Sequence, residues 1–276
     1  MARNSYSVSI SKFESNVICE DAASSSPLCV VVSDGSGGGG VYAEKWSKYL
    51  VESIPSDPIK TFEDLDRWVA GIWEPYYLSC ENLAKQTDGM TLRKFYEEGS
   101  FATLAAAWIE EDRAYWATYG DSVVFHYIKD QGILEWSTMR LTDFKEPPYL
   151  IGCSTPLKMK GFHSGQFSLA TSSILFAASD ALAHYIIMMF ELLNRDIFES
   201  EITQALNAHT KESSYIKAAQ GKKRRSFEPV LGKIVRSSRN KANFFRHLDA
   251  LYRRGLIAND DYSFAYVLPD SISNNQ

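Results

Sequence analysis

The sequence predicts a fold of mixed α and β class, in which strands and helices follow one another in blocks. Two observations carry this prediction: β-branched runs stop at polar loops, and apolar residues recur at helical spacing between those loops. Residues 28–33, LCVVVS, form the first predicted strand. Residues 41–54 and 61–83 follow as predicted helices, and Pro75 can bend the second of them.

Strand signals dominate after residue 101. The β-rich runs are residues 102–109, 114–119, 123–128 and 172–179. The first two of these runs predict a hairpin. Adjacent prolines and several glycines favour loops and short strands over residues 130–170. A helix over 181–206 and a last strand over 263–269 complete the predicted elements.

Composition places the chain among ordinary globular proteins. Its 276 residues are 45% hydrophobic and 23% charged, which excludes disordered and coiled-coil classes. The net charge of −5 argues against nucleic acid as a partner. The four cysteines lie far apart, and no apolar run approaches the length of a membrane span. We therefore expect a single domain over residues 1–276, cytoplasmic and monomeric, with no membrane partner.

Residues 222–254 differ from the rest of the chain in their charge. They carry eleven Lys or Arg against only Glu228 and Asp249, so this segment is near +9 and the remainder near −14. Apolar residues keep helical spacing here, which predicts a pair of amphipathic helices. The simpler interpretation is that their basic faces are merely solvated. The alternative is a docking surface for an acidic or phosphorylated partner.

Acidic residues recur at the ends of the predicted strands. They are Glu20 and Asp21 before the first strand, Asp34 after it, Asp121, Asp180, and the pair Asp260 and Asp261 before the last strand. If these ends meet, the carboxylates need a cation between them. Oxygen ligands without a His or Cys cluster select Mg²⁺, Mn²⁺ or Ca²⁺ rather than zinc. An Asp after a strand, taken alone, is most often a turn former or a helix N-cap, and Asp180 could simply cap the helix that follows it.

The glycine-rich loop after the first strand has a second interpretation. Gly35, Gly37 and Gly40 match the dinucleotide fingerprint G-x-G-x-x-G between a strand and a helix. The second strand with its terminal acid is missing, and Asp34 would repel a pyrophosphate. The sequence therefore disfavours a nucleotide site.

Four stretches of the chain occur in an order typical of one enzyme family. They are CEDA (19–22) with VVVSDGSGG (30–38), GSFATLAAAWI (99–109) with YGDS (119–122), ILFAASDAL (174–182), and DDYSFAYV (260–267). Together they resemble the metal-dependent Ser/Thr protein phosphatases of the 2C type (the PPM family), bacterial members in particular. The resemblance implies a four-layer αββα sandwich of two antiparallel sheets flanked by helices, with a metal site at one end.

The resemblance also implies roles for individual residues. The implied ligands of two Mg²⁺ or Mn²⁺ ions are Glu20, Asp34, Gly35 through its backbone carbonyl, Asp180 and Asp260, and Asp121 would help to hold a third ion. Asp34, Glu20 and Asp180 would carry catalysis. Asp21 and Asp261 would support the ligands. A hydroxide bridging two metal ions would attack the phosphorus of phosphoserine or phosphothreonine in a protein substrate.

The chain departs from the family pattern at the substrate phosphate. Asn16 stands where the family has an arginine, and Lys12 is the nearby cation. The interval between Asp180 and Asp260 is long, and we interpret residues 207–256 as a basic helical insertion. Within it, the substrate-binding candidates are Lys222, Lys223, Arg224 and Arg225. The missing arginine keeps two alternatives open: a regulatory or binding module with weak or no activity, and a hydrolase of small phosphoesters.

Overall fold

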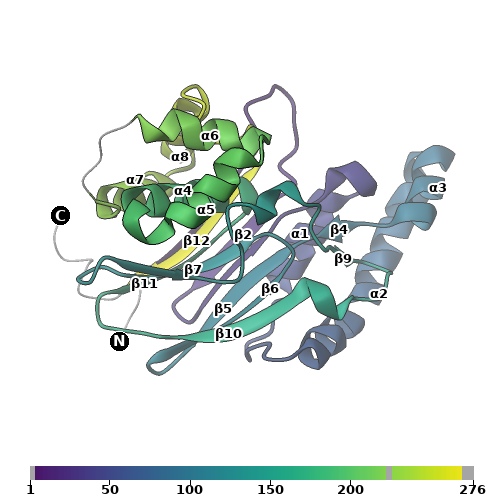
Figure 1. The fold of residues 1–276 in the computed structure, drawn as a ribbon. Helices are drawn as coiled ribbons and strands as arrows, with labels where there is room; N and C mark the ends of the chain where they lie inside the picture. Colours follow the sequence, from purple (N-terminus) through teal and green to yellow (C-terminus); the bar gives the residue numbers. More distant parts are fainter. Residues whose placement is uncertain (1–3, 222–225, 269–276) are drawn as a thin grey trace.

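The computed structural model describes residues 4–221 and 226–268. Two five-stranded antiparallel sheets lie against each other, and helices cover their outer faces (Figure 1). The first sheet runs in the order β1 (Asn4–Ile10), β12 (Tyr262–Leu268), β11 (Ser173–Ala178), β7 (Val123–Ile128) and β8 (Ile133–Trp136). The second runs in the order β10 (Phe162–Ser168), β6 (Arg113–Tyr119), β5 (Leu104–Glu110), β3 (Cys29–Ser33) and β2 (Ala22–Ser26).

Each sheet has its own helical layer. The first is covered by α4 (Asp180–Leu193), α5 (Arg195–Asn207), α6 (Lys211–Gln220), α7 (Glu228–Ser238) and α8 (Lys241–Tyr252). The second is covered by α1 (Ala43–Glu52), α2 (Phe62–Thr87) and α3 (Gly89–Glu98). The short pieces are β4 (Phe101–Ala102) paired with β9 (Ile151–Gly152), and the 3₁₀ turns η1 (Gly37–Gly39), η2 (Asp143–Lys145) and η3 (Met159–Gly161). The predicted α+β sandwich is confirmed.

The two sheets meet through small and β-branched side chains. The strands alternate, so that Val30 and Val32 of β3 face the other sheet while Val31 faces the helices. Ala105 and Ala177 contribute to the same inter-sheet layer. Side chains this small allow the backbones of the two sheets to approach closely. The strand ends of both sheets are thereby brought near each other.

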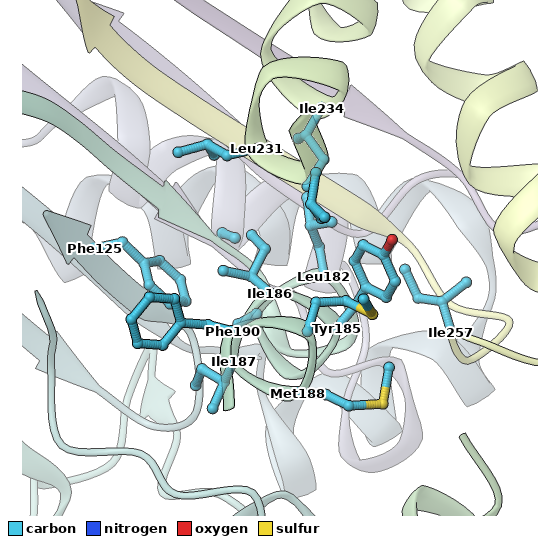
Figure 2. Packing of buried hydrophobic residues seen from close by; sticks show 14 of the residues in the cluster. Phe125, Leu182, Tyr185, Ile186, Ile187, Met188, Phe190, Leu231, Ile234 and Ile257 are labelled. Carbon is cyan, nitrogen blue, oxygen red and sulfur yellow. The ribbon is translucent and has the colours of Figure 1, made fainter. Parts of the chain in front are cut away.

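The outer core of the first sheet is dominated by α4. Its residues Leu182, Ile186 and Phe190 lie between the sheet and the helices above it (Figure 2). Phe125 and Phe176 stack on the sheet face below, with ring centroids 4.8 Å apart. A helix buried on nearly every side needs apolar residues all round, as α4 has.

Most predicted elements are present with shifted ends, and the structure departs from the prediction in two respects. The helix expected over 181–206 is two helices, because Asn194 ends α4 and its amide donates to the Phe190 carbonyl at 2.8 Å. The sequence analysis also missed several elements: β1, β2, β10 and α3. The basic segment does form the amphipathic pair α7 and α8. No helix within residues 4–221 and 226–268 is long and apolar enough to cross a bilayer.

Candidate metal centre

The acidic residues at the strand ends come together at one end of the sandwich. Asp34 follows β3, Asp121 precedes β7, and Asp180 begins α4 directly after β11. The pKa of Asp34 lies well above its usual range, because the carboxyl group is desolvated and because other carboxylates surround it. Those neighbours are Asp21, Asp180, Asp121 and Asp260. Residues far apart in the chain therefore share one electrostatic site.

Two of these side chains are buried with unpaired oxygens. Neither carboxylate oxygen of Asp21 has a hydrogen-bond partner in the described part of the chain, and Asp121 has one such oxygen. Burial raises the pKa of Asp21 to about 8, and the charge of Asp261 adds to the rise. The side chains of Ser179 and Asp34 lie near enough to oppose this rise, although neither forms a hydrogen bond of good geometry with Asp21. Burial and the charge of Asp260 raise the pKa of Asp121 to about 6. Buried acceptors without donors are costly, and a cation would relieve that cost.

Asp180 and Asp260 lie on the more open side of the centre. Asp180 is half-buried, and desolvation and the charges of Asp121 and Asp260 raise its pKa well above the usual range. The helix N-cap is Ser179, not Asp180, and the one hydrogen bond to the Asp180 carboxylate from the part of the chain that the structure describes comes from the neighbouring Ala181 N–H. The interpretation of Asp180 as a simple cap is therefore wrong. Asp260 is exposed at the rim.

The loop after β3 is held in place by the strand that carries the second sequence motif. The Asp34 N–H donates to Thr103 Oγ1 at 3.1 Å, and the Asp34 carbonyl accepts from the Thr103 N–H at 2.8 Å. Thr103 Oγ1 also lies 2.7 Å from Ser122 Oγ, beside Asp121. One threonine therefore links the backbone at Asp34 to the turn that carries Asp121.

Gly35 can only be glycine. A Cβ at this position would lie 2.4 Å from the Glu20 carbonyl oxygen and 2.8 Å from that of Ala43. The Ser47 hydroxyl also donates to the Glu20 carbonyl, which fixes this residue against α1. The close packing of Gly35 against the Glu20 carbonyl joins the two acidic motifs.

Asp261 anchors the N-terminal segment to the centre. One carboxylate oxygen accepts from the Lys12 N–H at 2.8 Å, and the other accepts from the Glu20 N–H at 2.5 Å. Burial raises the pKa of Glu20, and the Gly37 N–H and the Lys12 charge oppose that rise. The Glu20 carboxylate thus lies against the glycine-rich turn η1 at a position set by Asp261.

The donor set fits a hard divalent cation. It consists of carboxylate and carbonyl oxygens, several of them buried without partners. Within residues 4–221 and 226–268, no group of three or more His, Cys, Asp or Glu side chains is close enough together to hold an ion as it stands. Carboxylates that repel one another are expected to stand apart until a cation neutralises them.

This protein is similar to known proteins in its structure, whereas comparisons of its sequence find no match. No protein-family model matches the chain, and no curated protein sequence matches it either. Among solved structures, the catalytic domain of the Ser/Thr protein phosphatase PstP, in complex with two manganese ions, superposes with a TM-score of 0.53 at 13% identity. That match covers 96% of this chain and 97% of the other. This is the 2C-type phosphatase fold.

Two further structures share the 2C-type fold. PppA, described as a key regulatory component of T6SS in Pseudomonas aeruginosa, has a TM-score of 0.52 at 17% identity, over 97% of this chain and 98% of that one. The Ser/Thr phosphatase Stp1 from Staphylococcus aureus has a TM-score of 0.52 at 12% identity, over 97% and 95%. At such identities the likeness establishes the architecture alone.

Positive charge at the centre of this 2C-type fold comes from two lysines. Desolvation raises the pKa of Asp260, and the charges of Lys12 and Lys211 are among the effects that oppose it. Lys211 is the first residue of α6 and is exposed. Sequence analysis did not select it, because nothing in the sequence places the start of α6 beside Asp260. The other candidates, Lys222, Lys223, Arg224 and Arg225, lie outside the described residues.

Asn16 occupies a turn that suits its residue type. Its φ of 62° is in the left-handed region, which asparagine tolerates better than most residues. The side chain is exposed at the surface of the segment between Lys12 and Glu20. Asn16, which stands where the 2C-type pattern has an arginine, therefore adopts a left-handed backbone conformation.

A serine, a histidine and a glutamate form a separate hydrogen-bonded trio. His126 Nδ1 lies 2.8 Å from Glu135 Oε2, and its Nε2 lies 2.6 Å from Ser173 Oγ. Ser173 begins β11, at the opposite end of that strand from Asp180. His126 is fully buried, and Ser173 Oγ also accepts from the Ala170 N–H at 2.8 Å. The trio satisfies the hydrogen-bonding groups of a buried core histidine.

Proposed function

We propose that this protein is a metal-dependent phosphatase that hydrolyses phosphoserine and phosphothreonine in proteins. The observation that carries the proposal is the convergence of buried carboxylates with unpaired oxygens at one end of a 2C-type fold. Divalent cations would neutralise the site, which otherwise holds its carboxylates at strongly raised pKa values.

The proposed assignment follows the sequence motifs. Asp34, Glu20, the Gly35 carbonyl, Asp180 and Asp260 would together hold two Mg²⁺ or Mn²⁺ ions. Asp121 with Asp180 would take a third. When bound, such ions supply a water of lowered pKa and positive charge for the phosphoryl oxygens. Asp21 and Asp261 would orient the ligands, and the bond from Asp261 to the Glu20 N–H supports that role.

Binding of the phosphoryl group would fall to lysines. A phosphate dianion approaching this centre meets several carboxylates, so cations at the rim are needed to lower the repulsion. Lys12 and Lys211 are suitably placed, because their charges act on Asp260. An ammonium group is a point charge and does not reproduce the two-pronged bond of an arginine, so we expect weaker phosphate binding than an arginine would give.

The side chains favour hydrolysis without a covalent phosphoenzyme. The cysteine nearest the centre, Cys19, has its pKa raised to about 12 by burial and neighbouring carboxylates, so its thiol stays neutral. Burial likewise raises the pKa of Cys29 to about 12. A neutral thiol is a poor nucleophile, which disfavours a cysteine phosphoenzyme and is consistent with water as the attacking group.

The test is hydrolysis of p-nitrophenyl phosphate with Mn²⁺, with EDTA, and by Asp34→Asn. We expect turnover that requires Mn²⁺ and is lost in the variant, which thermal unfolding must show to be folded. No turnover by folded protein with saturating Mn²⁺ would refute the proposal. The Asn16 turn would then favour the second candidate function, a binding or regulatory module without catalysis. A third possibility, hydrolysis of small phosphoesters, predicts a kcat/KM for p-nitrophenyl phosphate above that for phosphopeptides.

A further inference from the structure

A groove lies beside the metal centre, between the end of β1 and the first turns of α8. Its volume is about 470 Å³, and it is lined by Ile10, Ser11, Lys241, Ala242, Phe245 and Arg246. Lysine and arginine supply the charge of this groove, and Ile10 and Phe245 supply an apolar floor. Among the residues that the structure describes, no acidic side chain lines it.

The groove adjoins the segment that positions Glu20. Ser11 precedes Lys12, whose N–H donates to Asp261, and the same carboxylate accepts the Glu20 N–H. Phe13, the residue after Lys12, packs edge-on against Phe245 with ring centroids 5.2 Å apart. Lys241 also lies near enough to Cys19 to affect it: burial raises the pKa of Cys19, and the positive charge of Lys241 slightly opposes this rise. A peptide bound at the metal centre could therefore extend directly into this groove.

The two cations of the groove are free to meet an external anion. Neither Lys241 nor Arg246 forms an ion pair with an acidic side chain among the residues described in the structure. Arg246 bonds only to neutral oxygens of its own helix, the Ala242 carbonyl at 3.3 Å and Asn243 Oδ1 at 2.6 Å. Both residues are exposed. Their charge is thus not balanced within the fold.

We propose that this groove binds an acidic side chain, Asp or Glu, that flanks the phosphorylated residue of a protein substrate. The inference rests on the proposed phosphatase function. Charge complementarity selects the ligand, because the metal centre is rich in carboxylates whereas this groove presents two cations, Lys241 and Arg246, on its surface. The apolar floor suits the aliphatic part of a glutamate side chain.

The experiment compares two phosphoserine peptides, one with Glu on both sides of the phosphoserine and one with Gln at the same positions. The test variant is Lys241→Gln with Arg246→Gln. The control is Lys233→Gln, which removes an exposed charge from α7. We expect the unmodified protein to prefer the Glu peptide by about threefold to tenfold in kcat/KM, as two exposed charge contacts allow. The double variant should lose this preference, and the control should keep it.

Two further measurements separate the possible failures. Turnover of p-nitrophenyl phosphate, which has no flanking residues, should be the same in all three proteins. Absence of that turnover would count against the proposed phosphatase function. The proposal that the groove binds an acidic side chain would then be tested by peptide binding alone. Fluorescence anisotropy with the dephosphorylated Glu peptide and Mn²⁺ should give a Kd about threefold to tenfold higher for the double variant, with a difference that shrinks at high salt. No Glu preference, or an equal loss in Lys233→Gln, would overturn the inference.

Discussion

Gly37→Ala is expected to displace the Glu20 carboxylate without unfolding the protein. A Cβ at Gly37 would lie 2.2 Å from Glu20 Oε1 and 2.5 Å from Oε2. Ordinary contact begins near 3.4 Å, so the carboxylate must withdraw by about 1.2 Å. The backbone at Gly37 has no positive φ, so alanine brings no conformational strain of its own.

Gly38→Ala is the matched control, because a Cβ there meets nothing within 4 Å. A misplacement of about 1 Å at a reacting site can cost about 100-fold in rate, and a disturbed support for a metal ligand costs about 10- to 100-fold in affinity. We therefore expect Gly37→Ala to weaken Mn²⁺ binding by about 10- to 100-fold relative to Gly38→Ala. The free energies of unfolding of the two variants should agree within about 1 kcal/mol.

The assay is calorimetric titration with Mn²⁺, together with p-nitrophenyl phosphate hydrolysis as a function of Mn²⁺ concentration. Urea unfolding without metal supplies the stability comparison. If Gly37→Ala bound Mn²⁺ and turned over substrate as Gly38→Ala does, Glu20 would not be a ligand at the position the structure gives it.

Three further predictions concern stability. Gly35→Ala should lower the free energy of unfolding, measured in urea, by about 1–3 kcal/mol or more. The reason is that the new Cβ meets backbone oxygens of Glu20 and Ala43, which cannot rotate away. An unchanged midpoint of urea unfolding would contradict the packing described. Asp34→Asn should raise the melting temperature of metal-free protein at pH 8, since it removes a buried charge from a repelling cluster, and it should abolish the further rise on adding Mn²⁺. Glu191→Gln should flatten the dependence of stability on pH. Burial and the charge of Glu201 raise the pKa of Glu191 from 4.5 to about 8, so the folded protein holds a proton that the unfolded chain lacks across that window. Stability should therefore fall with rising pH by at most about 1.4 kcal/mol per unit, and identical slopes in both proteins would refute a buried neutral Glu191.

The strands and helices that the sequence predicted best are those with one dominant local signal. The β-branched run of β3 and the apolar helix α4 needed no knowledge of their neighbours. By contrast, β2 is the serine-rich segment Ala22–Ser26, and its strand conformation depends on pairing with β3. In β10, Gly165 looks like a strand breaker. Its lack of a side chain instead admits the Trp116 ring, which lies 2.5 Å from where a Cβ would be.

The acidic set at the centre could be selected from the sequence because its members stand at the ends of predicted strands, and the family order of motifs then suggested a role for each. Spacing along the chain could not show that Asp21 would be buried with unpaired oxygens, since that depends on how the sheets pack. It could not place Lys211 beside Asp260 either. The groove between Ile10 and Arg246 joins segments more than two hundred residues apart, and no local pattern predicts it.

The position of β12 in the first sheet has a consequence for how the protein is made. This strand lies between β1 and β11, yet it is synthesised after every other strand of the sheet. Asp261, at its start, fixes the Lys12 and Glu20 segment from the other end of the chain. Until β12 has been synthesised, β1 lacks the strand with which it pairs, and the acidic centre lacks Asp260 and Asp261. The nascent protein is therefore expected to stay inactive, and open to chaperones, until β12 emerges and inserts.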